Sequence, residues 1–430
     1  MVKRQEKYFW HVGSSPPPLD SHSLVKHQIV RNYLERYIQV LMSNVLIEKL
    51  TLSIIDGFAG GGEYTADNGT VIHEGSPLIA LNTVAEQQIV LNVGRKKLRF
   101  VDAKFYFVEK DKGNFAYLQH LLGARGQSNR IGRDIELLGG AFQQRVNTII
   151  EDIKSRAGGE RAIFLLDQYA YDQVSAPLLK TIFSRVKGAE VLLTFNVDSL
   201  ISFLSDTAQS RKKLQEMGLD RYIDWSSIDR LKSAGGQVWR SAIQRNLAKG
   251  LVEISGAKHY TIFYITPLGS TTWTYWLVHL SNSFKARDVM MELHWQHANH
   301  FSHYLEPDLF TLGYSTNSDE SATGQNAFDL GQAHHFDSIA SERCLTGLEA
   351  KLVPTIYDLA KPTRFGDILE HFGSSTPATA DMIRSSLDAA IRNGDIDATA
   401  AKGDAKRLRG STLRLDDVLT AGQQRPIIFP

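Results

Sequence analysis

Three acidic residues that could do chemistry each end an apolar run. Asp56 ends "LTLSIID", Glu109 ends "KFYFVE" and Asp167 ends "RAIFLLD". Continuous apolar runs of this length are typical of parallel strands that are buried on both faces. Folds built on such sheets bind ligands at the carboxyl ends of the strands. The sequence therefore predicts these carboxylates at a ligand-binding edge.

The stretch "DGFAGGGEY" places four glycines directly after the first of these strands. Glycine permits positive φ and lets a ligand approach the backbone closely, so a glycine-rich turn here is typical of a nucleotide cradle. The turn is not a P-loop, because no Gly-Lys-Ser/Thr follows, and its spacing does not match G-x-G-x-x-G. The candidate cofactor contacts in the turn are Asp56, Phe58, Gly60 and Gly62.

Glu109 ends the second strand, where an acid takes the two hydroxyls of a ribose. A strand followed by D-x-F-x-G-x-G, with a second strand ending in V-E, is the pattern of S-adenosylmethionine-dependent methyltransferases. In those enzymes the glycine turn lies against the methionine part of the cofactor. NAD-binding oxidoreductases share the acid, but the glycine spacing argues against them. The predicted cofactor is S-adenosylmethionine, with S-adenosylhomocysteine as its product.

Two further strand ends depart from that pattern. After the third strand, Gly140 and Ala141 stand where an acid normally meets the adenine amine, so adenine would be held by main chain and by Phe142. After the fourth strand, "DQYA" replaces the Asp/Asn-Pro-Pro-Tyr that amino-methyltransferases often carry.

The fourth strand's end is the predicted catalytic position. Asp167 would accept a hydrogen bond from the substrate, Tyr169 would stack on a flipped base, and Asp172 would act as base. Methyl transfer asks the protein for little more than alignment and the removal of one proton. The alternative is that Asp167 caps the next helix and Tyr169 packs in the core.

Strands and helices alternate through the first part of the chain, which predicts an α/β fold with a doubly wound, Rossmann-like methyltransferase sheet. Five strand-like runs with helices between them are followed by a helical insertion at about 199–256 and a terminal hairpin at 258–281. The predicted parts are an N-terminal extension at 1–20, a methyltransferase-like domain at 21–310, a loop at 311–344 and a winged-helix-like domain at 345–430.

The C-terminal part reads as helix, turn, helix and two-stranded ribbon, which is a winged-helix pattern. Its basic residues are candidate contacts to DNA or RNA phosphates. Asp388, Asp395, Asp397 and Asp404 lie among them and weaken the positive field, so protein docking is an equal alternative. The candidate nucleic-acid-binding residues are Arg384, Lys402, Lys406, Arg407 and Arg409.

Length, net charge and cysteine content limit the classes of protein to which the chain can belong. The chain has 430 residues, a net charge of +1 and a single cysteine, Cys344, which excludes internal disulfides and a cysteine-rich metal site. No signal peptide or membrane span is expected, so the predicted location is cytoplasmic. Histidines recur every three residues in "HWQHANHFSH", but this spacing on a helix does not bring four to one metal, and no metal site is predicted.

The sequence resembles the three-Cys-motif partner (TcmP) family over roughly residues 20 to 300. The resemblance is carried by "SLVKHQIVRNYLERYI", "IIDGFAGGGEY", "EGSPLIAL", "FYFVEKD", "FLLDQYAYDQV" and "LLTFNVD". It implies a methyltransferase-like domain and a neighbouring three-cysteine protein similar to radical S-adenosylmethionine proteins, and it includes a Lys-His pair, here Lys26 and His27. These two residues would close over the cofactor, because the helix before the first strand commonly caps the pocket; the alternative is an exposed helical pair. It also implies Asp-Pro-aromatic-Gly at the fourth strand, where this chain has Asp167-Gln168-Tyr169-Ala170.

Two functional hypotheses follow. The first is a methyltransferase acting on a nucleic-acid base or a related polar nitrogen beside the three-cysteine partner. The second is a non-catalytic binding protein that keeps the fold while its C-terminal part recruits nucleic acid. The glycine turn and Glu109 favour the first, and the altered sequence after Asp167 favours the second.

Overall fold

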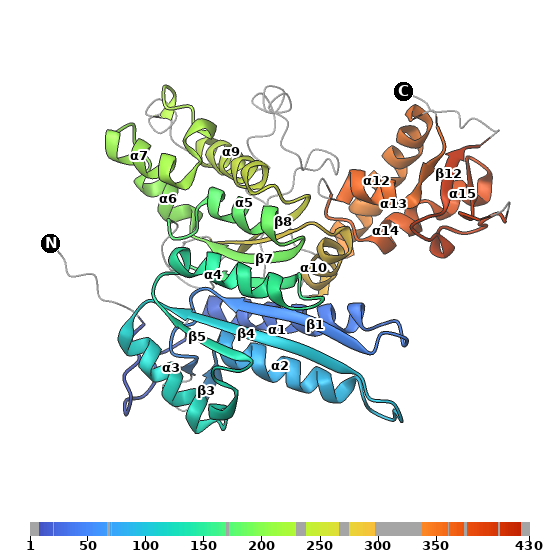
Figure 1. The fold of residues 1–430 in the computed structure, drawn as a ribbon. Helices are drawn as coiled ribbons and strands as arrows, with labels where there is room; N and C mark the ends of the chain where they lie inside the picture. The colour runs from blue at the N-terminus through green and yellow to red at the C-terminus, as the bar shows by residue number, and fades with distance from the viewer. Residues whose placement is uncertain are drawn as a thin grey trace. The chain divides into compact units, whose positions relative to one another are not determined.

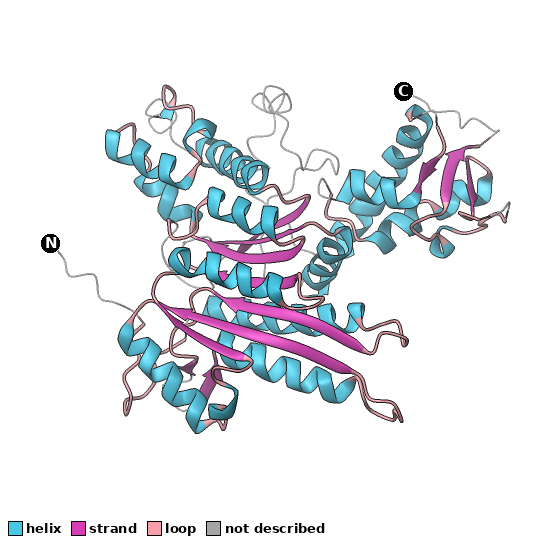
Figure 2. Cartoon of the chain, viewed as in Figure 1, coloured by secondary structure: helices cyan, strands magenta, loops and turns pink. Residues whose placement is uncertain are grey.

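The structure is a computed structural model, and the chain divides into two compact units, Met1–Val289 and Met290–Pro430 (Figure 1). The residues that it describes are 8–19, 21–66, 69, 71–168, 172–228, 238–265, 275–296, 338–359, 361–373, 376–402 and 405–422. Figure 2 shows the helices and strands of both units.

A seven-stranded sheet organises the first unit, in the order β5-β4-β1-β6-β7-β9-β8. Neighbours from β5 to β7 pair in parallel, whereas β9 runs antiparallel to both β7 and β8. The predicted terminal hairpin is therefore confirmed, and β9 is the inverted strand. The strands are β1 (Lys49–Asp56), β4 (Phe100–Glu109), β5 (Ile135–Gly139), β6 (Arg161–Asp167), β7 (Gly188–Phe195), β8 (His259–Ile265) and β9 (Tyr275–Ser281).

Helices cover both faces of this sheet (Figure 1). α1 packs beside α2, while α4 and α5 share a hydrophobic core with inward residues of β6 and β7 such as Phe164 and Val191. The predicted doubly wound arrangement is confirmed. Its helices are α1 (Ser21–Leu41), α2 (Ser76–Val90), α3 (Lys112–Ala124), α4 (Phe142–Ser155) and α5 (Ala176–Arg185).

The local reasons for these elements are visible in the sequence. β1 is buried along seven of its eight residues, because a strand covered on both faces needs apolar side chains on both. The apolar stripe of α4 runs from Phe142 through Val146 and Ile149 to Ile153, and each of these side chains is buried. α2 begins after Gly75 with Pro77 in its first turn, where the missing N–H costs nothing.

A short hairpin that the sequence did not predict follows the glycine turn. It joins β2 (Glu63–Ala66) to β3 (Val71–Glu74) in an antiparallel pair. Strands of four residues with exposed positions carry too little periodicity to be recognised. The N-terminal segment lies along this hairpin, since Leu19 N donates to Thr65 O at 2.8 Å and Thr65 N donates to Pro17 O at 2.9 Å.

The insertion is helical, as predicted. α6 (Val197–Phe203), α7 (Ala208–Met217) and α9 (Val238–Ser255) precede β8, and α10 (Phe284–Gln296) follows β9. α9 packs on α5, so the insertion extends the core on that face of the sheet. Among the described residues, no helix combines the length and apolar content needed to cross a bilayer.

The C-terminal unit combines short helices with a three-stranded sheet of order β10-β12-β11. Thr379 caps α14 by accepting from Met382 N at 3.2 Å. The sequence pattern placed the two ribbon strands in "IDATA" and "STLRLDDV", but the second of them, β12, begins only at Val418. α12, which was not predicted, begins inside the expected loop at 311–344. The elements are α12 (Ser338–Asp358), β10 (Thr363–Arg364), α13 (Phe365–Gly373), α14 (Ala380–Ser386), α15 (Asp388–Asn393), β11 (Ile396–Thr399) and β12 (Val418–Ala421).

Candidate active site

The sheet brings three carboxylates to the ends of three neighbouring strands. Glu109 ends β4, Asp56 ends β1 and Asp167 ends β6, and these strands are adjacent in the order β4-β1-β6. Burial, assisted by the charges of Asp167 and Glu109, raises the pKa of Asp56 to about 7. The three groups therefore interact electrostatically, which requires that they lie close together.

Glu109 is held against the glycine turn. Its Oε2 accepts from Gly60 N at 2.8 Å, and its Oε1 accepts from Asp111 N at 2.6 Å. Burial raises the pKa of the Glu109 carboxyl, and these backbone hydrogen bonds oppose the rise. The Lys110 backbone also contributes a hydrogen bond that lowers this pKa, and a carboxylate with about four lone-pair positions still keeps one free for a ligand.

Asp56 is the most enclosed of the three acids, with 1% of its surface exposed. Its Oδ1 accepts from Phe58 N at 3.0 Å. Its Oδ2 is buried and has no partner at hydrogen-bond geometry within the described part of the chain, although the nearby Ser76 hydroxyl partly offsets the rise in the pKa of this carboxyl. A buried carboxylate oxygen left in this state favours either protonation or a nearby cation.

The glycine turn is covered on one side by Trp10, which is 2% exposed. A Cβ added at Gly61 would lie 2.2 Å from Trp10 Cγ, and one at Gly60, whose φ is +56°, would lie 3.1 Å from the same indole. Trp10 Nε1 donates to Glu63 O at 2.6 Å, which fixes the ring. At Gly61 the missing side chain makes room for the protein's own tryptophan, so a ligand has to approach the turn from another side.

The predicted Lys-His pair reaches the site from α1. Lys26 Nζ lies 2.7 Å from both Oδ1 and Oδ2 of Asp167. Desolvation in the site would raise the pKa of Asp167, although 42% of its side chain stays exposed; the Lys26 ammonium, with help from Thr194 and His27, outweighs this effect and holds that pKa below its usual range. His27 is neutral at pH 7, because burial, assisted by Lys26, lowers its pKa to about 4.

Two aromatic residues at the site were missed by the sequence analysis. Tyr64 lies beside Trp10 and His27, with ring centroids 5.2 Å and 5.7 Å apart. Burial raises the pKa of Tyr64, followed by the charges of Asp167, Asp56 and Glu109, so its hydroxyl is near all three acids. Tyr64 stands directly after the glycine turn, which was the available signal. Trp10 lies far from every motif in the sequence, so no sequence signal pointed to it.

Phe142 and Phe58 lie next to each other, with ring centroids 6.2 Å apart. Phe142 also meets Phe164 edge-on, and only 1% of its surface is exposed. It is therefore a core residue at the start of α4, with little surface left for an adenine ring.

Gly62 adopts a φ of +89° in the glycine turn, where an added Cβ would lie 2.8 Å from Leu118 Cδ1.

The segment after β6 is shaped by Gln168, which replaces the expected proline. Its Oε1 accepts from Gln173 N at 3.1 Å and from Val174 N at 2.8 Å. Asp172 lies 2.9 Å from Lys213 Nζ of α7, in an ion pair that is partly exposed. Tyr169 lies outside the described residues. The predicted roles of Asp172 and Tyr169 thus stay predictions.

Three of the five basic residues proposed for nucleic-acid contact have acidic partners within the C-terminal unit. Arg407 forms a fork with Asp417, at 2.7 Å and 3.1 Å. Arg384 pairs with Asp381 at 2.6 Å, and Lys406 with Asp397 at 3.5 Å. Lys402 and Arg409 are exposed.

The histidine run falls largely outside the described residues. His294 is 1% exposed in α10. The other histidines considered in the sequence, His297, His300, His303, His334 and His335, are not among the residues that the structure describes. Across the described ranges, no group of three histidine, cysteine or acidic side chains is placed to hold a metal ion.

The order of the strands assigns the fold class. β9 runs antiparallel between the five parallel strands and β8, so the sheet has one inverted strand, which lies in the hairpin that the sequence predicted. The fold is a doubly wound α/β sheet. No protein-family model and no curated protein matches the sequence.

Solved structures share this architecture only at low similarity. Protein LPL1258 from Legionella pneumophila is 10% identical with a TM-score of 0.37, the match covering 64% of this chain and 91% of that one. The METTL16 methyltransferase domain is 10% identical with a TM-score of 0.26, covering 58% and 66%. A putative rRNA methylase from Clostridium thermocellum is 7% identical with a TM-score of 0.28, covering 58% and 93%. No activity or residue role is transferred from them.

Proposed function

We propose that the chain is an S-adenosylmethionine-dependent methyltransferase. The observation that carries this proposal is the hydrogen bond from Gly60 N to Glu109, beside Asp56 and Asp167 at the ends of the adjoining strands. It combines an acid suited to ribose hydroxyls with two further carboxylates on the same edge.

The charge of this edge favours a cationic cofactor over a dinucleotide. S-adenosylmethionine carries a positive sulfonium from which it donates its methyl group, together with an ammonium and a carboxylate whose charges cancel, so its net charge is positive. A pyrophosphate placed beside Asp56, Glu109 and Asp167 would instead be repelled. The buried Oδ2 of Asp56 also favours a cationic ligand, because a positive charge nearby would offset the cost of burying this oxygen.

Different residues of the site would contact different parts of the cofactor. Glu109 would accept from the ribose hydroxyls at the acceptor position that its backbone hydrogen bonds leave free. Asp56 would stabilise positive charge. Because Trp10 occupies the outer side of Gly61, the methionine portion would lie on the side of the turn toward Asp56 and Asp167.

Asp167 would position the acceptor rather than remove its proton. A carboxylate whose pKa is held below 3.8 by Lys26 is a weak base, although it accepts hydrogen bonds well. Its side chain keeps 42% of its surface exposed, so a polar nitrogen can reach it beside Lys26. We extend the proposal to an amine of a nucleic-acid base as the acceptor, with Tyr169 as the stacking ring.

Ligand binding tests the cofactor assignment. The melting temperature of the full chain should rise with S-adenosylmethionine and S-adenosylhomocysteine but not with NAD. Glu109→Ala should weaken binding by about tenfold or more, as expected when a hydrogen bond to a charged group is lost. A matched control is Glu48→Gln, an acid that is 61% exposed and pairs with Lys97. Absence of any shift with the first two ligands would refute the proposal.

A second candidate function is a non-catalytic protein that retains the fold. It is favoured by the Lys26 ammonium, which already binds both oxygens of Asp167. Incubation with labelled methyl donor and mixed nucleic acids distinguishes the two. Incorporation that Asp167→Ala abolishes supports the enzyme, whereas cofactor binding without incorporation, even with a three-Cys-motif partner added, supports the second candidate.

We also propose, from the sequence pattern and the family resemblance, that a three-Cys-motif protein is the working partner and that the C-terminal unit is a winged helix that contacts DNA or RNA. The exposed Lys402 and Arg409 are the residues best able to meet phosphates. Replacing both with glutamate should reduce salt-dependent retardation of nucleic acid in a gel. Unchanged retardation would assign the unit to protein docking.

A further inference from the structure

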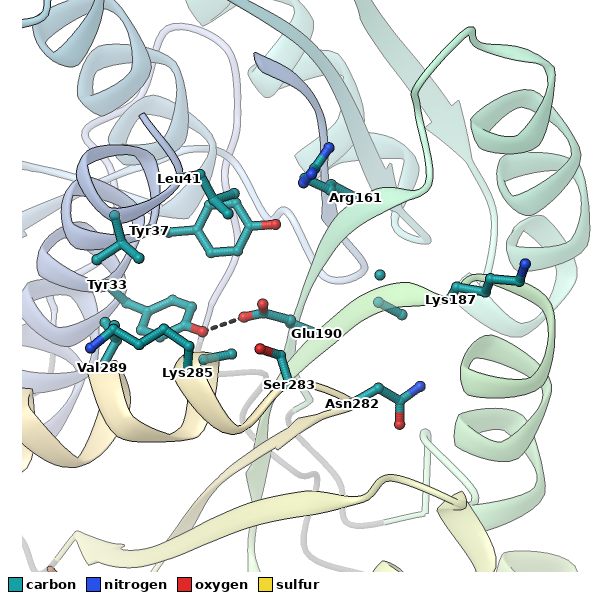
Figure 3. Close-up of a pocket in the computed structure, with 14 residues that line it drawn as sticks. Tyr33, Tyr37, Leu41, Arg161, Lys187, Glu190, Asn282, Ser283, Lys285 and Val289 are labelled. Carbon is teal, nitrogen blue, oxygen red and sulfur yellow. Dashed lines mark hydrogen bonds between the residues drawn. The ribbon is translucent and has the colours of Figure 1, made fainter. Parts of the chain in front are cut away.

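A pocket of about 210 Å³ opens at the other end of the sheet (Figure 3). It is lined by α1, by the first residues of β6 and β7, and by the junction of β9 with α10. Arg161 begins β6 at this pocket, and Asp167 ends the same strand at the candidate active site. The two sites are therefore separate.

Glu190 of β7 provides a carboxylate at the inner wall of this pocket. It is 6% exposed and accepts a hydrogen bond from the Tyr33 hydroxyl. His279 closes the group from β9, with Nε2 3.0 Å from the Tyr33 hydroxyl and 3.5 Å from Glu190 Oε2. Figure 3 shows the other carboxylate oxygen turned toward the space between Tyr37 and Arg161.

No lysine or arginine nitrogen within the described residues lies in ion-pair distance of Glu190. Lys285 pairs with Asp288 at 2.9 Å, and Lys187 points away from Glu190. His279 Nδ1 is buried and also has no hydrogen-bond partner in that part of the chain. Buried carboxylates are normally paired with a cation, whereas the ion-pair neighbour of Glu190 is His279, which is a cation only when protonated. Glu190 is therefore suited to a ligand that brings a permanent positive charge.

The mouth of the pocket carries a positive charge, in contrast to the carboxylate at its inner wall. Arg161 is exposed there, and no acidic partner lies within ion-pair distance of it among the described residues. The Tyr37 hydroxyl interacts with both charges. Burial and the charge of Glu190 raise its pKa, and the charge of Arg161 lowers it. Between the charges the wall is apolar, with Val40, Leu41 and Val289.

We propose that this pocket binds a free α-amino acid. The ammonium would sit on Glu190, the carboxylate on Arg161, and the side chain against the apolar wall. A cation alone would meet the positive mouth, and an anion alone would meet the buried carboxylate, so a small zwitterion is the chemistry that satisfies both. The volume admits a ligand of amino-acid size.

Calorimetry of the full chain with each standard amino acid at about 10 mM tests this proposal. At least one amino acid with an apolar side chain should bind. Arg161→Ala, a change at an exposed position, should weaken that binding by about tenfold, and Glu190→Gln by at least as much. The primary amine that lacks the carboxylate should bind weakly and be insensitive to Arg161→Ala.

The controls separate this site from the cofactor site. Arg133→Ala removes an arginine whose side chain is 72% exposed elsewhere in the unit, and should leave amino-acid binding unchanged. Glu109→Ala should also leave it unchanged, whatever its effect on S-adenosylmethionine. Circular dichroism checks that Glu190→Gln folds, and Arg161→Ala carries the test if it does not. Absence of binding, or binding that Arg161→Ala leaves intact, would overturn the proposal.

Discussion

Asp56→Asn tests the electrostatics of the candidate site most directly. Burial raises the pKa of Asp56 from 3.8 to about 7, which corresponds to about 4 kcal/mol at most. Because the folded chain holds this proton more tightly than the unfolded chain, its contribution to stability is complete below about pH 4. It is lost as the pH rises toward 7. Asparagine keeps an oxygen for Phe58 N and does not titrate.

The free energy of unfolding of the wild type should therefore fall, relative to Asp56→Asn, by up to about 4 kcal/mol between pH 4 and pH 7. His27 acts in the opposite direction, because its folded pKa of about 4 costs stability as the pH falls from 6.5. Comparing the two chains at each pH removes most of that effect, since both carry His27.

Urea unfolding followed by tryptophan fluorescence at several pH values measures this difference. The control is Glu48→Gln, at a position that is 61% exposed, which should run parallel to the wild type. If Asp56→Asn and the wild type also run parallel from pH 5 to pH 8, Asp56 is not the buried, proton-holding carboxyl described here. Saturating S-adenosylmethionine should shrink the difference, because a nearby cation lowers the pKa of Asp56.

Three further changes probe the same contacts and the C-terminal unit. Lys26→Met should cost about 1 kcal/mol at pH 7, a small loss because Asp167 is partly exposed. The loss should begin to shrink as the pH falls below about 4 and the Asp167 carboxyl is protonated, because its folded pKa is lowered; a pH-independent loss would contradict the ion pair. Gly61→Ala should lower the free energy of unfolding by about 1–3 kcal/mol, because its Cβ would lie 2.2 Å from Trp10. The same change should cost much less in a Trp10→Ala background, and a double-mutant cycle measures the difference. Arg407→Met should lower the urea midpoint of the C-terminal unit by removing the partner of a buried carboxylate, whereas the exposed Arg409→Ala should not; equal effects would place Arg407 outside the core.

Much of the first unit could be predicted from sequence because its signals are local. Parallel strands buried on both faces need unbroken apolar runs, and α4 needs its apolar stripe, so both are visible in the residues themselves. The β2–β3 hairpin escaped because four-residue strands have little periodicity. Prediction of the ribbon in the C-terminal unit placed its second strand too early, since short strands leave the register to tertiary contacts.

The sequence by itself determined that acids end three strands and that glycines follow the first of them. Only the tertiary structure decided what surrounds these groups. Trp10 covers the glycine turn and Lys26 binds Asp167 from residues that are distant in the chain, and Glu190 meets His279 through the pairing of β7 with β9. The physical reason is that residue type and spacing set local backbone preferences, whereas burial and charge depend on neighbours that only folding brings together.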